Sequence, residues 1–295
     1  MKRLCPHQNC AAPNLVIKDG YYKRLDDAKK IQRYRCKSCG LRFSAAVFSS
    51  FYRQKKRRIN SPLLKLLCSG VSLRRSALLL NVSKNTVSRK LPLLAKRARQ
   101  INQRKLLLNK SKISCIQLDD LITKENSKLR PLSVSVAVDE KRRSILAVEV
   151  SQIPAFGHLA KLGRKKYGYR QDRHAEGLER LFQTISHYEI DHKLKIKSDE
   201  HGRYPKVINK FFPWASHERF KSERAHIAGQ GELKKVQFDP LFAINHTCAI
   251  LRANINRLIR RTWCTTKDPA RLQDHLDLFV NYYNHELLPK SKTPL

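Results

Sequence analysis

Apolar and polar positions alternate through the middle of the chain with the two-residue period of a half-buried β-strand. We expect strands at residues 113–121, 131–138, 144–150, 194–199 and 216–220. The second and third of these are rich in β-branched residues, and the charged segment 139–143 between them predicts a hairpin turn. The first and fourth have the apolar composition of buried strands, so we predict a sheet with a covered centre.

Between and after these strands, apolar residues recur with the period of an amphipathic α-helix. We expect helices at residues 175–187, 204–212, 241–261 and 270–285. The order β-β-β-α-β-α-β is that of an RNase H-like α/β fold. The two last helices predict a helical part at the C-terminal end of that domain.

Two of the predicted strands deliver a carboxylate at their ends. Asp119 follows the apolar strand that begins at Ile113, and Asp199 ends the strand 194–199. Carboxylates that converge at the ends of rigid strands are the ligands required by hard cations such as Mg²⁺. A single Asp at a strand end is more often a cap or turn residue, so the catalytic interpretation depends on the pair.

Residues 61–100 have the pattern of a helix-turn-helix. One helix is expected from Leu63 to Cys68, a second from Leu73 to Leu80, and a third after Ser83 as N-cap. In the DNA-binding interpretation the third helix enters the major groove. Its expected DNA contacts are Lys84, Asn85, Thr86, Ser88, Arg89 and Lys90. A plain three-helix bundle is the alternative.

A proline follows this third helix closely. Pro92 should kink or reset the helix, because proline lacks a backbone N–H and its ring clashes with the preceding turn. Residues 93–112 are then expected to form a helical, basic linker to the catalytic domain.

Four cysteines near the N-terminus form two close pairs. Cys5 and Cys10 are separated by four residues and Cys36 and Cys39 by two, with 25 residues between the pairs. Each pair fits a zinc knuckle, a tight turn whose two thiolates face one ion. Four thiolates complete a tetrahedral shell, so we predict a structural Zn²⁺ site in a zinc ribbon. His7 could substitute for one ligand, and free buried cysteines are the alternative.

The chain is strongly basic, with 61 Lys and Arg against 24 Asp and Glu and a formal net charge of +37. Residues 1–110 contain 28 basic and 3 acidic residues, so the N-terminal third carries most of the excess. Such a surplus indicates a polyanionic partner, most often nucleic acid. No apolar run approaches the roughly 20 residues that span a bilayer. The N-terminus has no apolar signal-peptide region, so we expect a cytoplasmic protein without a membrane partner.

These segments together resemble transposases of the insertion-sequence-one type and related bacterial families. The resembling stretches are CPHQNC with QRYRCKSCG, SKNTVSRK, IQLDD, IKSDEHGRY and LRANINRLIRRTWCTTK, which together span nearly the whole chain. In that family a zinc ribbon and a helix-turn-helix precede a DDE catalytic domain with an RNase H-like fold. The resemblance implies a ribbon at 1–50, a helix-turn-helix and linker at 58–105, and a catalytic domain at 112–295.

The resemblance also assigns catalytic residues. Asp119 matches the first acid and Asp199 the second, while Asp120 stands where the family often has Glu. The family's third acid aligns with Asn245, which is a departure from its pattern. An amide oxygen can still coordinate Mg²⁺, although without charge, and a carboxylate is the better ligand. The candidates for the third position are Asn245, Glu232 and His246.

A basic residue follows on the same predicted helix. Arg252 lies seven residues, or two helical turns, beyond Asn245 and therefore shares its face. It matches a basic residue that the family keeps, which implies that it grips a phosphate beside the cut. An ordinary surface arginine is the alternative.

The resemblance implies a transposase that binds the terminal inverted repeats of an insertion sequence. With two Mg²⁺ (or Mn²⁺) ions it would cut DNA at the ends and transfer the strands into target DNA. Because two ends must be joined, we expect a homodimer or a larger assembly, associated with the bacterial nucleoid when bound to DNA. The missing Glu motivates the alternative of a catalytically decayed, sequence-specific DNA-binding protein. An RNase H-type nuclease is disfavoured by the two DNA-binding modules at the front.

Overall fold

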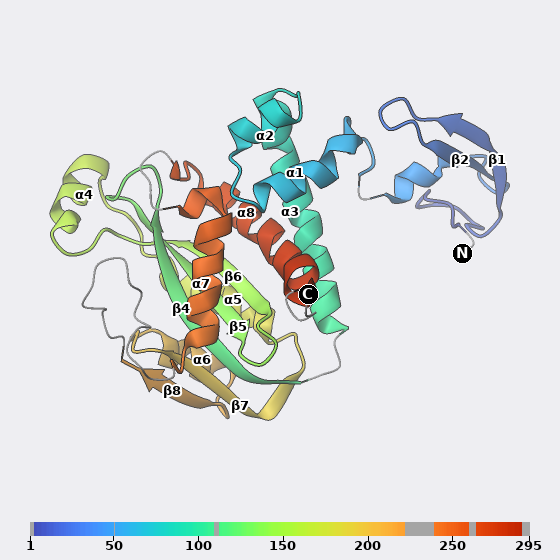
Figure 1. The fold of residues 1–295 in the computed structure, drawn as a ribbon. Coiled ribbons are helices and arrows are strands. Elements are labelled where there is room, and N and C mark those ends of the chain that lie inside the picture. Colours follow the sequence, from blue (N-terminus) through green and yellow to red (C-terminus); the bar gives the residue numbers. More distant parts are fainter. Residues whose placement is uncertain (1–2, 50, 109–111, 222–238, 260–263, 291–295) are drawn as a thin grey trace. The chain divides into compact units, whose positions relative to one another are not determined.

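The structure is a computed structural model that describes residues 3–49, 51–108, 112–221, 239–259 and 264–290 (Figure 1). The chain divides into two compact units, Met1–Leu63 and Leu64–Leu295. The helix α1 (Asn60–Leu67) lies across this division. The expected division into three domains stays a prediction.

The first unit contains a three-stranded antiparallel sheet. Its strands are β1 (Val16–Lys23), β2 (Lys30–Cys36) and β3 (Arg42–Ser44), in that order. The buried residues of its core are Cys5, Cys36 and Phe43, and Phe43 stacks on Tyr34 with ring centroids 5.5 Å apart. Because a domain of this size has little apolar surface to bury, a core so small calls for a further stabilising element.

The second unit begins with helices that match the expected helix-turn-helix pattern. They are α2 (Leu73–Leu79) and α3 (Lys84–Leu107), and the Ser83 hydroxyl caps α3 by accepting from the Thr86 N–H at 3.2 Å.

Pro92 does not reset α3, which continues through it as one helix of 24 residues. This helix packs along α8 (Pro269–Tyr282) and buries Leu91, Leu94, Ala95 and Ala98. That packing offsets the backbone hydrogen bond lost at proline.

The centre of this unit is a five-stranded mixed sheet. Its strands are β4 (Ile113–Lys124), β5 (Pro131–Asp139), β6 (Ile145–Gln152), β7 (Ile190–Asp199) and β8 (Ser216–Phe220). Their spatial order is β6-β5-β4-β7-β8, with β4, β5 and β6 antiparallel and β7 and β8 parallel to β4. All five strands were expected from the sequence. The order and directions are compatible with an RNase H-like domain.

Different helices cover the two faces of β4 (Figure 1). On one face Ile116 and Leu118 join a core with residues of α5 (His174–Ile185) and α6 (Tyr204–Phe211). On the other face lies α7 (Phe242–Asn254), where the Ile244 N–H donates to the Gln117 side-chain oxygen at 2.9 Å. Because side chains alternate along a strand, neighbouring residues of β4 face different helices.

The remaining helices differ in part from expectation. The helix expected over 241–261 ends at Asn254 and is followed by a 3₁₀ turn, Asn256–Leu258. The segment between β6 and α5 contains α4 (Leu159–Tyr167), whose last turn carries Arg164, Lys165 and Lys166. After α8, a π-helical turn (Tyr283–Leu287) leads into α9 (Leu288–Lys290). Among the described residues, no helix combines the length and apolar character of a membrane span.

Candidate active site

The two predicted catalytic aspartates lie on neighbouring parallel strands. Leu118 of β4 pairs with Ser198 of β7, so Asp119 and Asp199 follow at the same level of the sheet. Asp199 is the last residue of β7, and its carboxylate accepts from the His201 N–H at 3.2 Å. The structure therefore places the two aspartates that the sequence singled out on neighbouring strands. Only Asp199 ends its strand, as expected; Asp119 lies in the middle of β4, because pairing with β5 extends that strand to Lys124.

The electrostatics of Asp119 fit a cation ligand. Its carboxylate accepts from the Asp120 N–H at 2.7 Å. Burial, followed by the negative charges of Asp199 and Asp120, raises the pKa of Asp119 to about 7, although that hydrogen bond and Arg252 act in the opposite direction. A buried carboxylate beside a second carboxylate is stabilised in its charged form by a bound divalent cation, so the donor set fits Mg²⁺ or Mn²⁺.

The helix α7 lies over the Asp119 face of β4. The Cys248 thiol lies 4.0 Å from the Asp119 carboxylate, and burial and that carboxylate raise the pKa of Cys248. Sequence reasoning missed Cys248 as a neighbour of the site. Its position three residues after Asn245, on the same helical face, was the available signal. Arg252, one turn further, is half-buried and close enough to favour the ionised form of Asp119.

The three candidates for the third ligand have different surroundings. The Asn245 amide donates to the Asp239 carboxylate at 3.0 Å, which holds the side chain near the start of α7. His246 is exposed, and its ring stacks on Phe242 with centroids 5.7 Å apart. Burial and Arg143 lower the pKa of His246. Glu232 lies outside the described residues. No carboxylate occurs within α7 itself.

Asp120 faces the opposite side of β4 from Asp119. Its carboxylate accepts hydrogen bonds from Ser133 (2.8 Å), Ser135 (2.5 Å) and Tyr204 (2.8 Å), and it also lies against His174. Burial alone would raise the pKa of Asp120, but His174 and the hydroxyl donors outweigh burial and lower it to about 2. Asp120 is therefore an ionised carboxylate held by several donors.

A pocket of about 440 Å³ opens beside Asp120. Its lining includes Asp199, His174, His201 and Arg203, and Arg203 forms an ion pair with Asp172 at 2.5 Å. Asp199 thus lines this pocket and also acts electrostatically on Asp119. Sequence reasoning missed both histidines. The signal for His201 was its position two residues after Asp199, whereas His174 had none.

The four N-terminal cysteines form one cluster, with all four sulfur atoms within 4.8 Å of one another. The sulfurs of Cys5 and Cys39 are 3.6 Å apart, as are those of Cys10 and Cys36. Tetrahedral coordination with Zn–S bonds of about 2.3 Å requires sulfur separations of about 3.8 Å. The cluster therefore fits the expected structural Zn²⁺.

The expected DNA-contacting residues lie at the start of α3. Lys84, Asn85, Ser88 and Arg89 are exposed and Thr86 is half-buried, whereas Lys90 is only 5% exposed and lies on the packed side of the helix. Four of these side chains are thus accessible to a partner. Their contact with DNA stays a prediction.

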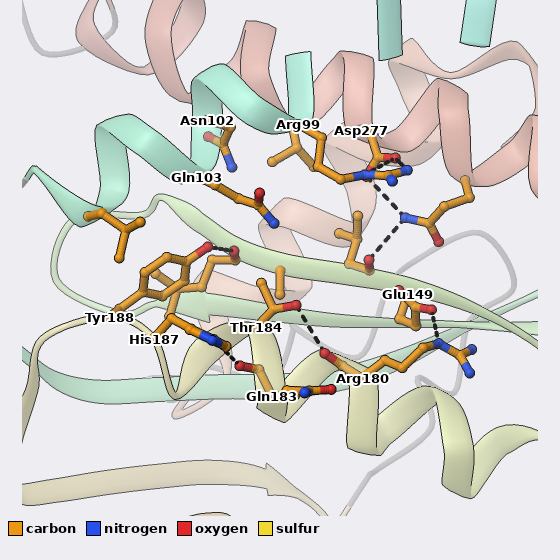
Figure 2. Close-up of a pocket in the computed structure, with 16 residues that line it drawn as sticks. Arg99, Asn102, Gln103, Glu149, Arg180, Gln183, Thr184, His187, Tyr188 and Asp277 are labelled. Atoms are coloured by element: carbon orange, nitrogen blue, oxygen red, sulfur yellow. Dashed lines mark hydrogen bonds and ion pairs between the residues drawn. The ribbon is translucent and has the colours of Figure 1, made fainter. Parts of the chain in front are cut away.

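A second hollow, of about 560 Å³, lies among α3, β6, α5 and α8 (Figure 2). Its charged side chains pair with one another, Arg99 with Asp277 and Arg180 with Glu149. Gln273 completes the set by donating to Asp277 at 3.1 Å. None of the described residues that were predicted for the site lines this hollow, so Asp119 and Asp199 remain the candidate centre.

Comparison with known proteins adds little to this geometry. No protein-family model matches the chain, and no curated protein matches it. One similar solved structure is described as a pre-cleavage Mos1 transpososome, with 10% identity over 80% of this chain and 79% of that one. Its TM-score is 0.19, which is too low to support an argument about fold or function.

Proposed function

We propose that this chain is a DDE-type transposase, which binds the ends of an insertion sequence and catalyses metal-dependent DNA cleavage and strand transfer. The observation that carries the proposal is that Asp119 and Asp199 each follow the paired residues Leu118 and Ser198 of two adjacent parallel strands. The basic composition of the chain supports a nucleic-acid substrate, because a net charge of +37 favours a polyanion.

In this proposal Asp119 and Asp199 hold the catalytic cations. Bound Mg²⁺ or Mn²⁺ supplies an activated water and stabilises the leaving 3′ oxygen. Asp119 must be ionised to act as a ligand, and its pKa of about 7 makes it sensitive to pH near neutrality. The guanidinium of Arg252, close to Asp119, positions the scissile phosphate.

Asn245 is the proposed third ligand, with Glu232 and His246 as the other candidates. Asn245 lies on α7, three residues before Cys248, whose thiol reaches the Asp119 carboxylate. Its amide nitrogen donates to Asp239, which leaves the amide oxygen as the group that can face a cation. A neutral oxygen holds an ion more weakly than Glu does.

DNA binding is assigned to the N-terminal modules. In the proposal a ribbon closed by Zn²⁺ and the exposed start of α3 hold the terminal inverted repeats. Phosphate contacts from basic side chains supply most of the affinity. Joining two ends calls for a homodimer or a larger assembly.

One observation favours a second candidate function. The helix α7 contains neither Asp nor Glu, whereas the resembling family has Glu at the position of Asn245. A chain that keeps its DNA-binding modules but has lost a ligand would act as a sequence-specific DNA-binding protein without cleavage activity.

The deciding experiment uses labelled duplexes of the inverted repeats that flank the gene. The full chain is incubated with these duplexes in Mg²⁺ or Mn²⁺, beside Asp119→Asn and the control Asp191→Asn, which alters the other end of β7. We expect nicks at the repeat boundary that leave a 3′-OH with the wild type and the control only.

End-specific binding without a nick in either metal would reject the enzyme and support the DNA-binding protein. If nicks persist in Asp119→Asn, then the assignment of the centre is wrong. Loss of cleavage in Asn245→Ala but not in His246→Ala or Glu232→Gln would identify the third ligand.

A further inference from the structure

Three side chains from separate elements converge on the α5 and α6 side of β4. They are Asp120 of β4, His174 at the first position of α5, and His201 in the connection between β7 and α6. One ligand atom from each lies within 4.8 Å of the other two. The two imidazole rings meet edge to face with centroids 5.0 Å apart.

The protein groups of this cluster do not satisfy the hydrogen-bonding capacity of His174. The residue is 3% exposed, and its buried Nε2 atom makes no well-directed hydrogen bond to a described residue. Nε2 lies 2.8 Å from the Asp120 carboxylate, yet the contact lacks the direction of a hydrogen bond. A buried polar atom without a well-directed hydrogen bond lowers the stability of the fold, so we expect a bound group to contact this nitrogen.

We propose that Asp120, His174 and His201 bind one divalent transition-metal ion. Two atoms that ligate the same ion approach each other to about 3 Å without a hydrogen bond between them, because each points at the ion. The 2.8 Å separation of the His174 Nε2 and Asp120 carboxylate atoms, outside hydrogen-bond geometry, matches that arrangement.

The donor set decides the class of ion. Imidazole nitrogen suits Zn²⁺, Mn²⁺, Co²⁺ and Fe²⁺, whereas Mg²⁺ prefers an all-oxygen shell. Two nitrogens and one carboxylate oxygen therefore select a transition metal over Mg²⁺. The site lines the pocket of about 440 Å³, so an ion and its remaining water ligands have room there.

This ion would differ from the catalytic cations in place and in role. Asp120 and Asp119 face opposite sides of β4, and the ion would join β4, the start of α5 and the connection after β7. Asp199 is the last residue of β7, and His201 follows it by two residues in that connection. The ion would therefore fix the position of Asp199. This positioning role rests on the proposed function, whereas the binding site does not.

The first test counts metal ions in the full chain. The purified protein is saturated with Zn²⁺ in a large excess of Mg²⁺, which competes for the carboxylate centre at Asp119 and Asp199. It is then freed of excess Zn²⁺, and its zinc content is measured by mass spectrometry. We expect two ions per wild-type chain, one in the cysteine cluster and one here. We expect one ion in His201→Gln, and two in the control His187→Gln, which replaces an exposed histidine elsewhere.

A cobalt titration of the wild-type chain makes the test independent of how a variant folds. Co²⁺ in the cysteine cluster gives thiolate charge-transfer absorption. The proposed site has no thiolate, so a second equivalent should add only weak visible bands. One ion per wild-type chain, or two in His201→Gln, would overturn the proposal.

The same samples separate this proposal from the proposed function. If the chain binds two ions but never cuts end duplexes, the site stands and the enzyme fails. If it cuts DNA while binding a single zinc in the cysteine cluster, the enzyme stands and the site fails. A site that positions Asp199 also predicts that Zn²⁺ occupancy lowers the Mg²⁺ concentration needed for half-maximal cleavage in the wild type but not in His201→Gln.

Discussion

At the scale of single residues, β4 places two adjacent aspartates, Asp119 and Asp120, in surroundings that shift their pKa values in opposite directions. Asp119 is half-buried near Asp199 and has a raised pKa, whereas Asp120 is held by hydroxyls and His174 and has a lowered pKa. The cause is the alternation of a β-strand, which turns neighbouring side chains toward different helices. An adjacent pair in sequence is therefore not an adjacent pair of ligands.

Replacing Asp119 with Asn should stabilise the protein while abolishing cleavage. The pKa of Asp119 is about 7 in the folded state and about 3.9 in the unfolded state, so the folded state binds this proton more tightly. The proton therefore stabilises the fold fully below about pH 4, and this stabilisation is lost as the pH rises toward 7. Without added Mg²⁺, Asp119→Asn should raise the free energy of unfolding by about 2 to 4 kcal/mol at pH 8 and by much less at pH 4.5. Urea unfolding at both pH values checks this, with Asp191→Asn as control. An equal gain at both values would contradict it.

Introducing the family's glutamate at Asn245 should not improve this site. Asn245 donates to the Asp239 carboxylate at 3.0 Å, so Asn245→Glu exchanges a hydrogen bond for repulsion between two carboxylates. We expect the free energy of unfolding to fall by about 1 to 3 kcal/mol. Asn245→Glu combined with Asp239→Asn should recover most of the loss. Urea unfolding of the four-member cycle measures the coupling, and strictly additive effects would refute the interpretation.

At the scale of elements, α3 serves as both a candidate DNA reader and a packing element. Its first turn is exposed and capped by Ser83, whereas its later turns bury apolar residues against α8. Arg99 of α3 donates to the Asp277 carboxylate of α8 at 2.9 Å. The helix therefore continues through Pro92, because its far half is held by tertiary contacts.

Charge removal at the start of α3 should weaken DNA binding with a defined salt signature. Lys84→Gln and Arg89→Gln each remove one exposed charge, so each should reduce the slope of log affinity against log salt by about 1. Arg104→Gln, near the other end of α3, is the control and should leave the slope unchanged. Fluorescence anisotropy on an end duplex over a salt series measures the slopes. Equal slopes for Arg89→Gln and Arg104→Gln would exclude this end of α3 as the contact.

At the scale of the whole molecule, the two units are stabilised by different means. The second unit has a large apolar core built from its sheet and helices. The first has a described core of Cys5, Cys36 and Phe43 with a few partly buried neighbours. A small sheet of this kind depends on a cross-link or a metal for stability.

Disrupting the cysteine cluster should unfold only the first unit. Cys39→Ser removes one sulfur from the cluster, and Lys37→Ser alters its exposed neighbour as the control. In Cys39→Ser we expect amide protection to be lost in β1, β2 and β3 and retained in β4 to β8. Hydrogen exchange followed by mass spectrometry checks both regions. Protection that survives in β2 would show that the metal is dispensable there.

The sequence by itself predicted the strands of the central sheet and singled out Asp119 and Asp199 as the candidate pair. Alternation and apolar composition predicted all five strands of the central sheet, because burial of one face imposes a two-residue period and burial of both faces favours apolar runs. The same pattern singled out Asp119 and Asp199, although only Asp199 lies at a strand end. The cysteine spacing predicted a cluster that the structure brings together. Local patterns carry this information since each depends on residues close in sequence.

Only the tertiary structure decided which distant side chains meet. From α7 it placed Cys248 rather than a carboxylate beside Asp119, and it joined Asp120 with His174 and His201 across three elements. It also carried α3 through Pro92, against the local preference of proline. Such contacts join residues that are far apart in sequence. Packing between helices and sheet sets them, and no local period records that packing.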